Sequence, residues 1–330
     1  MKAKTIKRMA AIILAGSMMA GMSTSAMADP QQATITKKIT KEANDYAPNT
    51  TFTFSVAPGT AVDAGEGQDA IYAGPAGGVY FAEGAGTISS VPDSSDIGET
   101  TTEVGSTQIS IDASMFPGPG IYRYMVTESA GTYEGVTYTG VSKNFDVYVN
   151  SEKQVYAYAF VDPSAEGGKD DGVFTNSYDV KDLTISKTVE GNQGDKTKAF
   201  SFTIQVSGAD GEQYYVTFSD NREAVTLNGT SMTITLANGQ TATIHGLSGT
   251  DTYTVTEDDY SRDGYLTKFD NEKTNTKSGT ISGDTTVSVV NTKNATTPTG
   301  IVMDIAPYLV MILAAVVLAF VFLRKRSCTK

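Results

Sequence analysis

Between its two ends, the chain consists of short segments in which apolar and polar residues alternate. Phe52–Val56 and Phe200–Val206 are examples, with an aromatic or branched residue at every second position. A period of two is typical of β-strands that bury one face, and Gly, Asp, Asn and Ser separate the segments as turn residues do. No helical period stands out in this region. The pattern predicts an all-β fold of sandwich architecture.

The first 28 residues depart from this pattern and are typical of a removable signal peptide. Four basic side chains lie within the first eight positions, and an apolar run over residues 9–22 follows them. Ala26-Met27-Ala28 supplies the small residues that a signal peptidase requires, so we expect cleavage between Ala28 and Asp29. A permanent membrane anchor is the alternative, but the apolar run is short for one.

The C-terminus has three parts in a fixed order. Pro298-Thr299-Gly300 comes first, an apolar stretch of membrane-spanning length follows over Ile305–Leu323, and the basic residues Arg324–Arg326 come last. This order resembles a sortase sorting signal, although the leucine of Leu-Pro-x-Thr-Gly is absent and the motif is closer to the Val-Pro-Thr-Gly variant of some pilins. The resemblance implies that a sortase cuts between Thr299 and Gly300 and passes Thr299 to an amine. A simple C-terminal membrane tail is the alternative.

Composition narrows the partners of the exported part. Cleavage at both ends would leave 271 residues, which suits two domains of ordinary size. The formal charge of −12 becomes about −19 once the +4 of the first segment and the +3 of the residues after Thr299 are removed. Such a charge argues against nucleic acid and anionic membrane surfaces as partners. The only cysteine, Cys328, lies in the tail, so disulfides are excluded from the exported part.

Histidine is equally scarce. His245 is the only one, and we expect it at an exposed strand end without a role. With so few ligands and bases, we expect no metal site and no cofactor. A secreted hydrolase is a poor interpretation, because the sequence also lacks Gly-x-Ser-x-Gly. We therefore predict a protein that is not an enzyme.

The same order of segments occurs twice, which predicts two tandem domains of one kind. Each copy has a strand with a lysine, a Phe-x-Phe strand, a Tyr-x-Val-x-Glu strand and a final segment with an asparagine. The corresponding pairs are residues 33–37 and 183–187, 52–56 and 200–206, 124–128 and 253–257, and 173–176 and 289–291. We predict a signal peptide at 1–28, domains at 29–179 and 180–295, and a sorting signal at 296–330. A Gly- and Ser-rich insertion around residues 64–107, expected to be loop with short strands, lengthens the first domain.

A lysine, a glutamate and an asparagine of each copy fall in phase with the apolar residues of their strands. Side chains alternate between the two faces of a strand, so these polar residues are expected to face the core. Burying a free ammonium group is costly, and its repetition in the same order needs a reason. The two sets are Lys37, Glu128 and Asn176, and Lys187, Glu257 and Asn291. The alternative is an ordinary set of solvent-directed lysines, an edge glutamate and a turn asparagine.

These residues resemble the streptococcal-type pilin isopeptide domain family, which is related to the Ig-like Cna-B sandwiches. The resemblance implies that the lysine attacks the asparagine side-chain amide, ammonia leaves and an isopeptide bond remains. An apolar surrounding would lower the lysine pKa, and a protonated glutamate could polarise the amide carbonyl and shuttle protons. By this resemblance the bonds join Lys37 to Asn176 and Lys187 to Asn291, with Glu128 and Glu257 as the catalytic groups.

Two lysine assignments stay open. Lys38 adjoins Lys37, so a one-residue shift in strand register would exchange them, and Lys41 is a further candidate. An acceptor amine for the next subunit is not marked by the Tyr-Pro-Lys motif of many pilins. In the smaller two-domain pilins that this chain resembles, the acceptor lies a few residues before the first bonding asparagine, which selects Lys169. An ordinary loop lysine is the alternative.

The resemblance implies a structural role, as the backbone subunit of a covalent pilus that is secreted and held at the cell wall. Its partners would be further copies of itself, a sortase, minor pilins and peptidoglycan, with no nucleic acid, and a host or matrix ligand is not assigned. The alternative is a monomeric wall adhesin or a minor pilin, because the insertion around residues 64–107 could form a binding surface.

Overall fold

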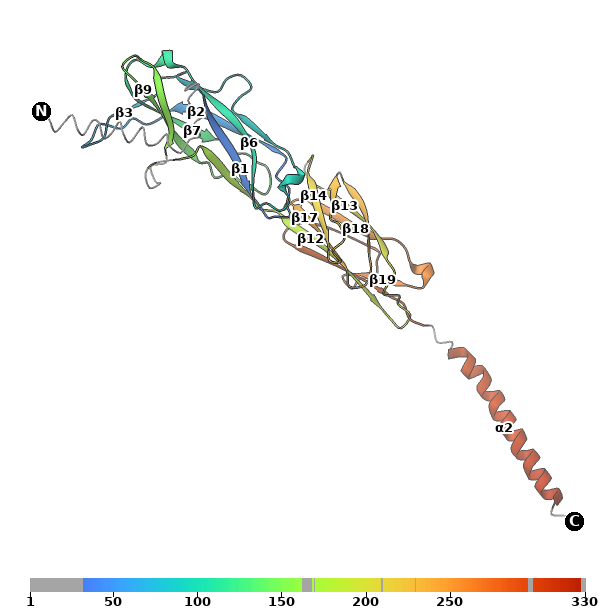
Figure 1. Cartoon of the computed structure of the whole chain (residues 1–330). Coiled ribbons are helices and arrows are strands. Elements are labelled where there is room, and N and C mark those ends of the chain that lie inside the picture. Colours follow the sequence, from blue (N-terminus) through green and yellow to red (C-terminus); the bar gives the residue numbers. More distant parts are fainter. Residues whose placement is uncertain are drawn as a thin grey trace.

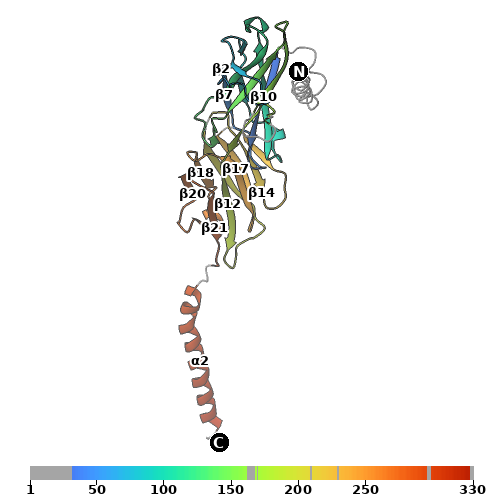
Figure 2. The same ribbon diagram turned by 90° about the vertical axis from the view of Figure 1, so that its left-hand side faces the viewer.

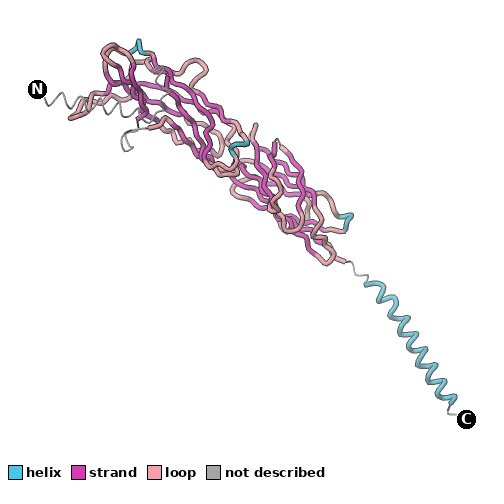
Figure 3. The backbone as a smooth tube through the Cα atoms, in the orientation of Figure 1, coloured by secondary structure: helices cyan, strands magenta, loops and turns pink. Residues whose placement is uncertain are grey.

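The computed structural model describes residues 32–161, 168, 170–208, 210–228, 230–295 and 299–327. The predicted signal peptide, its cleavage site at Ala28 and Asp29, and the predicted acceptor Lys169 lie outside the described residues. Strands dominate the described chain up to the C-terminal helix (Figure 3). The predicted all-β fold is confirmed for this part.

Residues 32–178 form two sheets that share one core. One sheet has the strand order β4-β6-β1-β11-β8, and the other has the order β10-β9-β7-β2-β5 with β3 beside β7. In chain order the strands are β1 (Gln32–Thr40), β2 (Thr50–Pro58), β3 (Ile71–Ala73), β4 (Val79–Tyr80), β5 (Thr87–Ser90), β6 (Thr101–Ile111), β7 (Gly120–Glu128), β8 (Val136–Thr137), β9 (Ser142–Val149), β10 (Val155–Val161) and β11 (Val173–Tyr178). We call this unit the first sandwich. Its insertion contains the short strands β3 to β5, as expected, and also most of the eleven-residue strand β6, which was not expected.

Residues 181–292 form the second sandwich. Its sheets have the orders β15-β14-β17-β12-β21-β19 and β16-β13-β18-β20. The strands are β12 (Lys181–Glu190), β13 (Phe200–Ser207), β14 (Gln213–Phe218), β15 (Val225–Asn228), β16 (Ser231–Leu236), β17 (Thr241–Leu247), β18 (Thr252–Glu257), β19 (Leu266–Phe269), β20 (Thr276–Thr280) and β21 (Thr285–Thr292). Short 3-10 turns occur at Ser94–Asp96, Ala113–Met115 and Ser261–Asp263.

The alternation in the sequence becomes the two cores. Along β13, Phe200, Phe202 and Ile204 are buried, and the residues between them are half-buried or exposed. The strands β1, β12 and β18 show the same alternation of burial. Each sandwich therefore has a single apolar core, filled from the inner faces of both of its sheets.

The first and last strands of each sandwich lie side by side and run parallel. In the first sandwich β1 pairs with β11, and in the second β12 pairs with β21. Because the first and last strands of a sandwich are neighbours, nearly all of its sequence lies in the loop that connects these two strands. A bond between these strands would therefore clamp the entire unit.

One prediction about the fold is wrong. His245 was expected at an exposed strand end, but it lies within β17 and its side chain is buried. Its Nδ1 lies 2.9 Å from Asp182 Oδ1 and its Nε2 lies 2.9 Å from Thr217 Oγ1. The hydrogen bonds on both ring nitrogens satisfy a buried imidazole, which is why the position tolerates burial.

The two sandwiches stand end to end, and their long axes follow one line (Figures 1 and 2). Two residues, Asp179 and Val180, separate β11 from β12, and Val180 is buried in the core of the first sandwich. Tyr46 Oη lies 2.6 Å from Thr226 Oγ1 across the junction, and Tyr133 donates to Glu212 Oε1 at 2.7 Å. A short connection with such contacts favours a stiff rod.

Beyond the second sandwich the chain continues as helix α2 (Thr299–Ser327), which projects away from both sandwiches (Figure 1). Its described apolar side chains between Tyr308 and Val321 are exposed. Among the residues that the structure describes, no helix meets the length and apolarity required for crossing a membrane.

Candidate functional site

The parallel strand pairs place a lysine and an asparagine diagonally across from each other in both sandwiches. In the first, Lys37 is paired with Phe174 and Asn176 is two residues further along β11. In the second, Lys187 is paired with Val289 and Asn291 is again two residues further along. Residues two apart on a strand share a face, so each lysine and asparagine point into the same core from adjacent strands. All four side chains are buried.

The glutamate comes from the opposite sheet. Glu128 ends β7 and is paired with Phe54 of β2, while Glu257 ends β18 and is paired with Phe202 of β13. The Phe-x-Phe and Tyr-x-Val-x-Glu segments of the sequence are therefore neighbouring strands. Together they deliver a buried carboxyl across the core to the lysine.

In the first sandwich the glutamate binds both partners. Glu128 Oε2 accepts from Lys37 Nζ at 2.8 Å, and Oε1 accepts from Asn176 Nδ2 at 2.6 Å. The remaining amide atom, Asn176 Oδ1, is buried and has no hydrogen-bond partner within the described residues. A carbonyl that is buried without a donor is unusual in a protein core and calls for an explanation.

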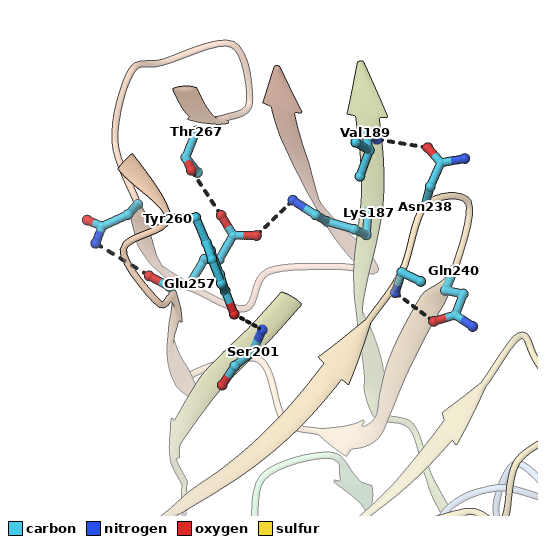
Figure 4. A network of polar contacts seen from close by, with 10 residues as sticks. Lys187, Val189, Ser201, Asn238, Gln240, Glu257, Tyr260 and Thr267 are labelled. Atoms are coloured by element: carbon cyan, nitrogen blue, oxygen red, sulfur yellow. Dashed lines mark hydrogen bonds and ion pairs between the residues drawn. The ribbon is translucent and has the colours of Figure 1, made fainter. Parts of the chain in front are cut away.

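In the second sandwich the glutamate binds the lysine and a threonine. Glu257 Oε1 accepts from Lys187 Nζ at 2.7 Å, and Oε2 accepts from Thr267 Oγ1 at 3.0 Å (Figure 4). Both amide atoms of Asn291 are buried and lack a hydrogen-bond partner among the residues that the structure describes. An unpaired buried polar group costs about 1–3 kcal/mol, so this asparagine is a local source of instability.

An aromatic ring lies against each ammonium group. Lys37 Nζ lies 4.5 Å from the centre of the Phe52 ring, and Lys187 Nζ lies 4.2 Å from that of Phe200. Burial lowers the pKa of Lys37 against the opposing effect of the Glu128 hydrogen bond and charge. Burial likewise lowers the pKa of Lys187 to about 8, against the opposing effect of Glu257. Both amines are therefore closer to their neutral, nucleophilic form than a lysine in water.

The arrangement suits the transfer of an acyl group from an amide to an amine. A nucleophile of lowered pKa, a carboxyl that can relay protons and an amide whose carbonyl oxygen has no hydrogen-bond partner among the described residues meet in a core that excludes water. The excluded water matters, because it would otherwise compete as a nucleophile. The described residues contain no cluster of three or more groups suited to a metal ion.

The structure distinguishes among the three lysines of the N-terminal segment. Lys37 meets Glu128, while Lys38 is only half-buried and follows a shift in the β1–β6 register. The shift leaves Val104 unpaired, next to Gly105, which has a φ of +153° and where a Cβ would lie 2.8 Å from Ile88. Lys41 is buried elsewhere and donates to the carbonyl oxygens of Asp96 at 2.6 Å and Glu99 at 2.7 Å.

Other predicted positions are not part of these clusters. Thr299 and Gly300 begin helix α2 beyond the second sandwich, and Lys169 lies outside the described residues. Thr267 was missed by the sequence reasoning. Its signal was weak, because β19 is only four residues long and its pairing with Asn291 is visible only in the folded sheet.

Two family models together cover most of the chain between residues 33 and 293. Residues 33–179 match the family described as a Spy0128-like isopeptide containing domain. Residues 181–293 match a domain of unknown function, DUF7601.

Two curated streptococcal pilus proteins are also similar to this chain. A curated protein named "Pilin" from Streptococcus pyogenes serotype M1 is 28% identical, over 89% of this chain and 90% of its own length. The pilus tip adhesin Cpa of Streptococcus pyogenes is 32% identical, but over 37% of this chain and 18% of its own.

Solved structures agree with these matches. The crystal structure of the major pilin from Streptococcus pyogenes is 25% identical and covers 81% of this chain and 100% of its own, with a TM-score of 0.55. The major pilin T3.2 from the same species is also 25% identical, covers 81% of this chain and 98% of its own, and has a TM-score of 0.53. Residues 33–179 therefore form a Spy0128-like isopeptide containing domain, and the chain as a whole is similar to the streptococcal major pilins.

Proposed function

We propose that the chain is the backbone subunit of a covalently assembled pilus and that two internal isopeptide bonds lock its sandwiches. The bonds would join Lys37 to Asn176 and Lys187 to Asn291. The observation that carries the proposal is the repeated cluster of a buried lysine, glutamate and unsatisfied asparagine on the first and last strands of each sandwich. Pilins are cell-surface proteins, and the curated pilin relative covers nearly the whole chain.

Bond formation follows from the chemistry of the cluster. The neutral lysine Nζ attacks the asparagine Cγ, a C–N bond forms, and the bond from Cγ to Nδ2 breaks. The departing nitrogen takes up the proton that leaves the amine, and ammonia is released. Glu128 and Glu257 contact the amine directly, so each can relay that proton in its own sandwich.

The unpaired polar atoms of the two asparagines favour the cross-linked product over the unreacted core. A buried amide without partners costs free energy, and so does an ammonium group held away from water. The reaction replaces a buried amine and a primary amide by one secondary amide, and ammonia leaves the core. Each glutamate would act once, on its own chain. The proposed role of the protein is therefore structural.

Assembly would use the two ends of the exported part. In this proposal the signal peptide at 1–28 is removed, the sandwiches span 29–179 and 180–295, and 296–330 is the sorting signal. A sortase would cut between Thr299 and Gly300 and join Thr299 to Lys169 of the next copy. Support comes from the order of Pro298-Thr299-Gly300, the apolar Ile305–Leu323 and the basic tail, together with the single lysine between 153 and 176. Minor pilins and peptidoglycan are further proposed partners.

The test is co-expression of the full chain with a pilus sortase in a Gram-positive host. Wall extracts boiled in detergent should give a ladder of covalent multimers. Lys169→Ala should abolish the ladder and leave monomer, while Lys153→Ala is the matched control and should leave the ladder intact. A single monomeric band from the unmodified chain would contradict the backbone role and favour a wall-anchored adhesin or minor pilin.

A further inference from the structure

Thr267 is placed to act on the second cluster through its glutamate. Its hydroxyl donates to Glu257 Oε2 at 3.0 Å, while the other oxygen of the same carboxyl accepts from Lys187 at 2.7 Å (Figure 4). Thr267 is also the residue of β19 that pairs with Asn291 of β21. One half-buried side chain thus lies next to the asparagine in the sheet and binds the carboxyl that faces the lysine.

The first sandwich differs at the matching place. Strand β8 pairs with β11 as β19 pairs with β21, and continuing its register by one residue sets Tyr138 opposite Asn176. Tyr138 packs on Phe52, with 6.0 Å between the ring centres, and Phe52 lies under Lys37. There the second oxygen of Glu128 accepts from Asn176 Nδ2. The threonine contact therefore stands where the first cluster has a contact to the asparagine itself.

We propose that Thr267 is a positioning residue for the Lys187–Asn291 bond, an inference that rests on the proposed isopeptide chemistry. By binding Oε2, its hydroxyl fixes the rotation of the Glu257 carboxyl and keeps Oε1 on the lysine. It also occupies the carboxyl oxygen Oε2, which would otherwise be free to accept a hydrogen bond from Asn291 Nδ2.

The consequence for the reaction is specific. Asn291 keeps an amide that no hydrogen bond ties down, because neither of its polar atoms has a partner among the described residues. Oε1 of Glu257 is then the oxygen that takes the proton from Lys187 Nζ and returns it to the leaving nitrogen. Without the Thr267 hydroxyl, the Glu257 carboxyl can rotate, so it spends a smaller fraction of the time in the reactive geometry.

The experiment follows each bond during synthesis of the chain from Asp29 to Thr299. Cell-free translation is stopped at successive times, and peptide mapping quantifies the Lys37–Asn176 and Lys187–Asn291 cross-links separately. Thr267→Val removes the hydroxyl at equal size, and Thr267→Ser restores it. Thr256→Val is the matched control, because Thr256 lies next to Glu257 but its hydroxyl contacts Thr276 Oγ1 at 3.0 Å.

We expect Thr267→Val to slow the second bond by about tenfold, the effect of losing one hydrogen bond, and to leave the first bond unchanged. Thr267→Ser and Thr256→Val should form both bonds at the wild-type rate. A normal rate of the second bond in Thr267→Val would overturn the inference. So would an equal slowing in Thr267→Ser, which would assign the effect to the methyl group and its packing.

The proposed function fails in a different way. If the unmodified chain loses no ammonia at either cluster, the isopeptide chemistry itself is wrong and the inference about Thr267 falls with it. If the unmodified chain forms both bonds and Thr267→Val forms them equally fast, only the inference about Thr267 is wrong. The first bond in the same molecule thus serves as the internal standard.

Discussion

The two sandwiches hold the same three residues in the same register but bind their glutamates differently. Glu128 contacts both Lys37 and Asn176, whereas Glu257 contacts Lys187 and Thr267 and leaves Asn291 unbound. The backbone frame is shared, because each lysine and asparagine occupy matching positions on parallel first and last strands. The difference arises outside the duplicated pattern, where Thr267 lies on β19 in the second sandwich and Tyr138 directly follows β8 in the first.

This contrast separates what the reaction requires from what each sandwich adds. The buried lysine with lowered pKa, the carboxyl on its amine and the aromatic ring beneath it occur in both clusters. The second contact of the carboxyl is variable. We therefore assign the proton relay to the oxygen that faces the lysine, and orientation to the other oxygen.

The largest expected effect comes from removing either relay. Glu128→Ala should stop the first bond and leave the second, and Glu257→Ala should do the reverse. Removal of a general acid–base group slows a reaction by about 10²- to 10⁴-fold. A bond that forms this slowly should not be complete within the time of expression. Intact mass should show one ammonia lost instead of two, and peptide mapping should show which bond remains. Loss of both bonds from one substitution would refute the independence of the clusters.

Removal of the asparagine that the lysine attacks should lower the free energy of unfolding by a similar amount in both sandwiches. Each proposed bond would close a loop of more than 100 residues, between 37 and 176 or between 187 and 291. By analogy with disulfide loops of this length, Asn176→Ala and Asn291→Ala should each reduce the free energy of unfolding of their own sandwich by about 5 kcal/mol. Guanidinium unfolding of each variant measures the change.

The control for this prediction is Asn44→Ala, which alters an exposed asparagine outside both clusters. It should leave unfolding unchanged within about 0.5 kcal/mol. A clearly smaller loss of unfolding free energy for Asn291→Ala than for Asn176→Ala would show that the second bond is incompletely formed. The two sandwiches would then not be equivalent.

The rate of the second bond should rise with pH. The neutral amine is the nucleophile, and Lys187 has a pKa of about 8 because of burial. Below that value its neutral fraction increases about tenfold per pH unit, and above it the rate should level off. The first bond should follow the same direction, since burial also lowers the pKa of Lys37. Cross-linking of newly made chain between pH 6 and 9 tests this, and a rate that falls over this range would contradict it.

The smallest expected effect lies at the junction between the sandwiches. Asp45 is buried there, and its pKa is raised to about 6 by burial and by the charges of Asp182 and Glu42, against His245 and Lys41. Between about pH 4 and 6 the folded chain binds the proton that the unfolded chain releases, so stability falls as pH rises.

Asp45→Asn removes this dependence. It should exceed the wild-type chain in stability by about 1–3 kcal/mol above pH 6 and equal it below pH 4. Thermal unfolding at the two pH values measures the difference. Both internal bonds should still form, because Asp45 contacts neither cluster. A variant that is less stable than wild type at pH 7 would show that the charged carboxylate stabilises the junction.

The sequence predicted the parts of this picture that repeat with strand periodicity. The β-fold followed from alternation, and the core-facing lysine, glutamate and asparagine positions followed from their phase with residues such as Ile35 and Val255. Contacts that depend on sheet order did not follow. Thr267 lies in a four-residue strand, and His245 looked exposed because its partner Asp182 is 63 residues away in the chain. Short strands and long-range partners leave little mark on a local pattern.

The most direct measurement is the intact mass of the folded chain from Asp29 to Thr299, followed by peptide mapping. We predict a mass lower than that of the unmodified sequence by two ammonia molecules, with cross-linked peptides that join Lys37 to Asn176 and Lys187 to Asn291. A folded chain with the full unmodified mass would contradict the account, since the two buried clusters would then be ion pairs without a covalent product.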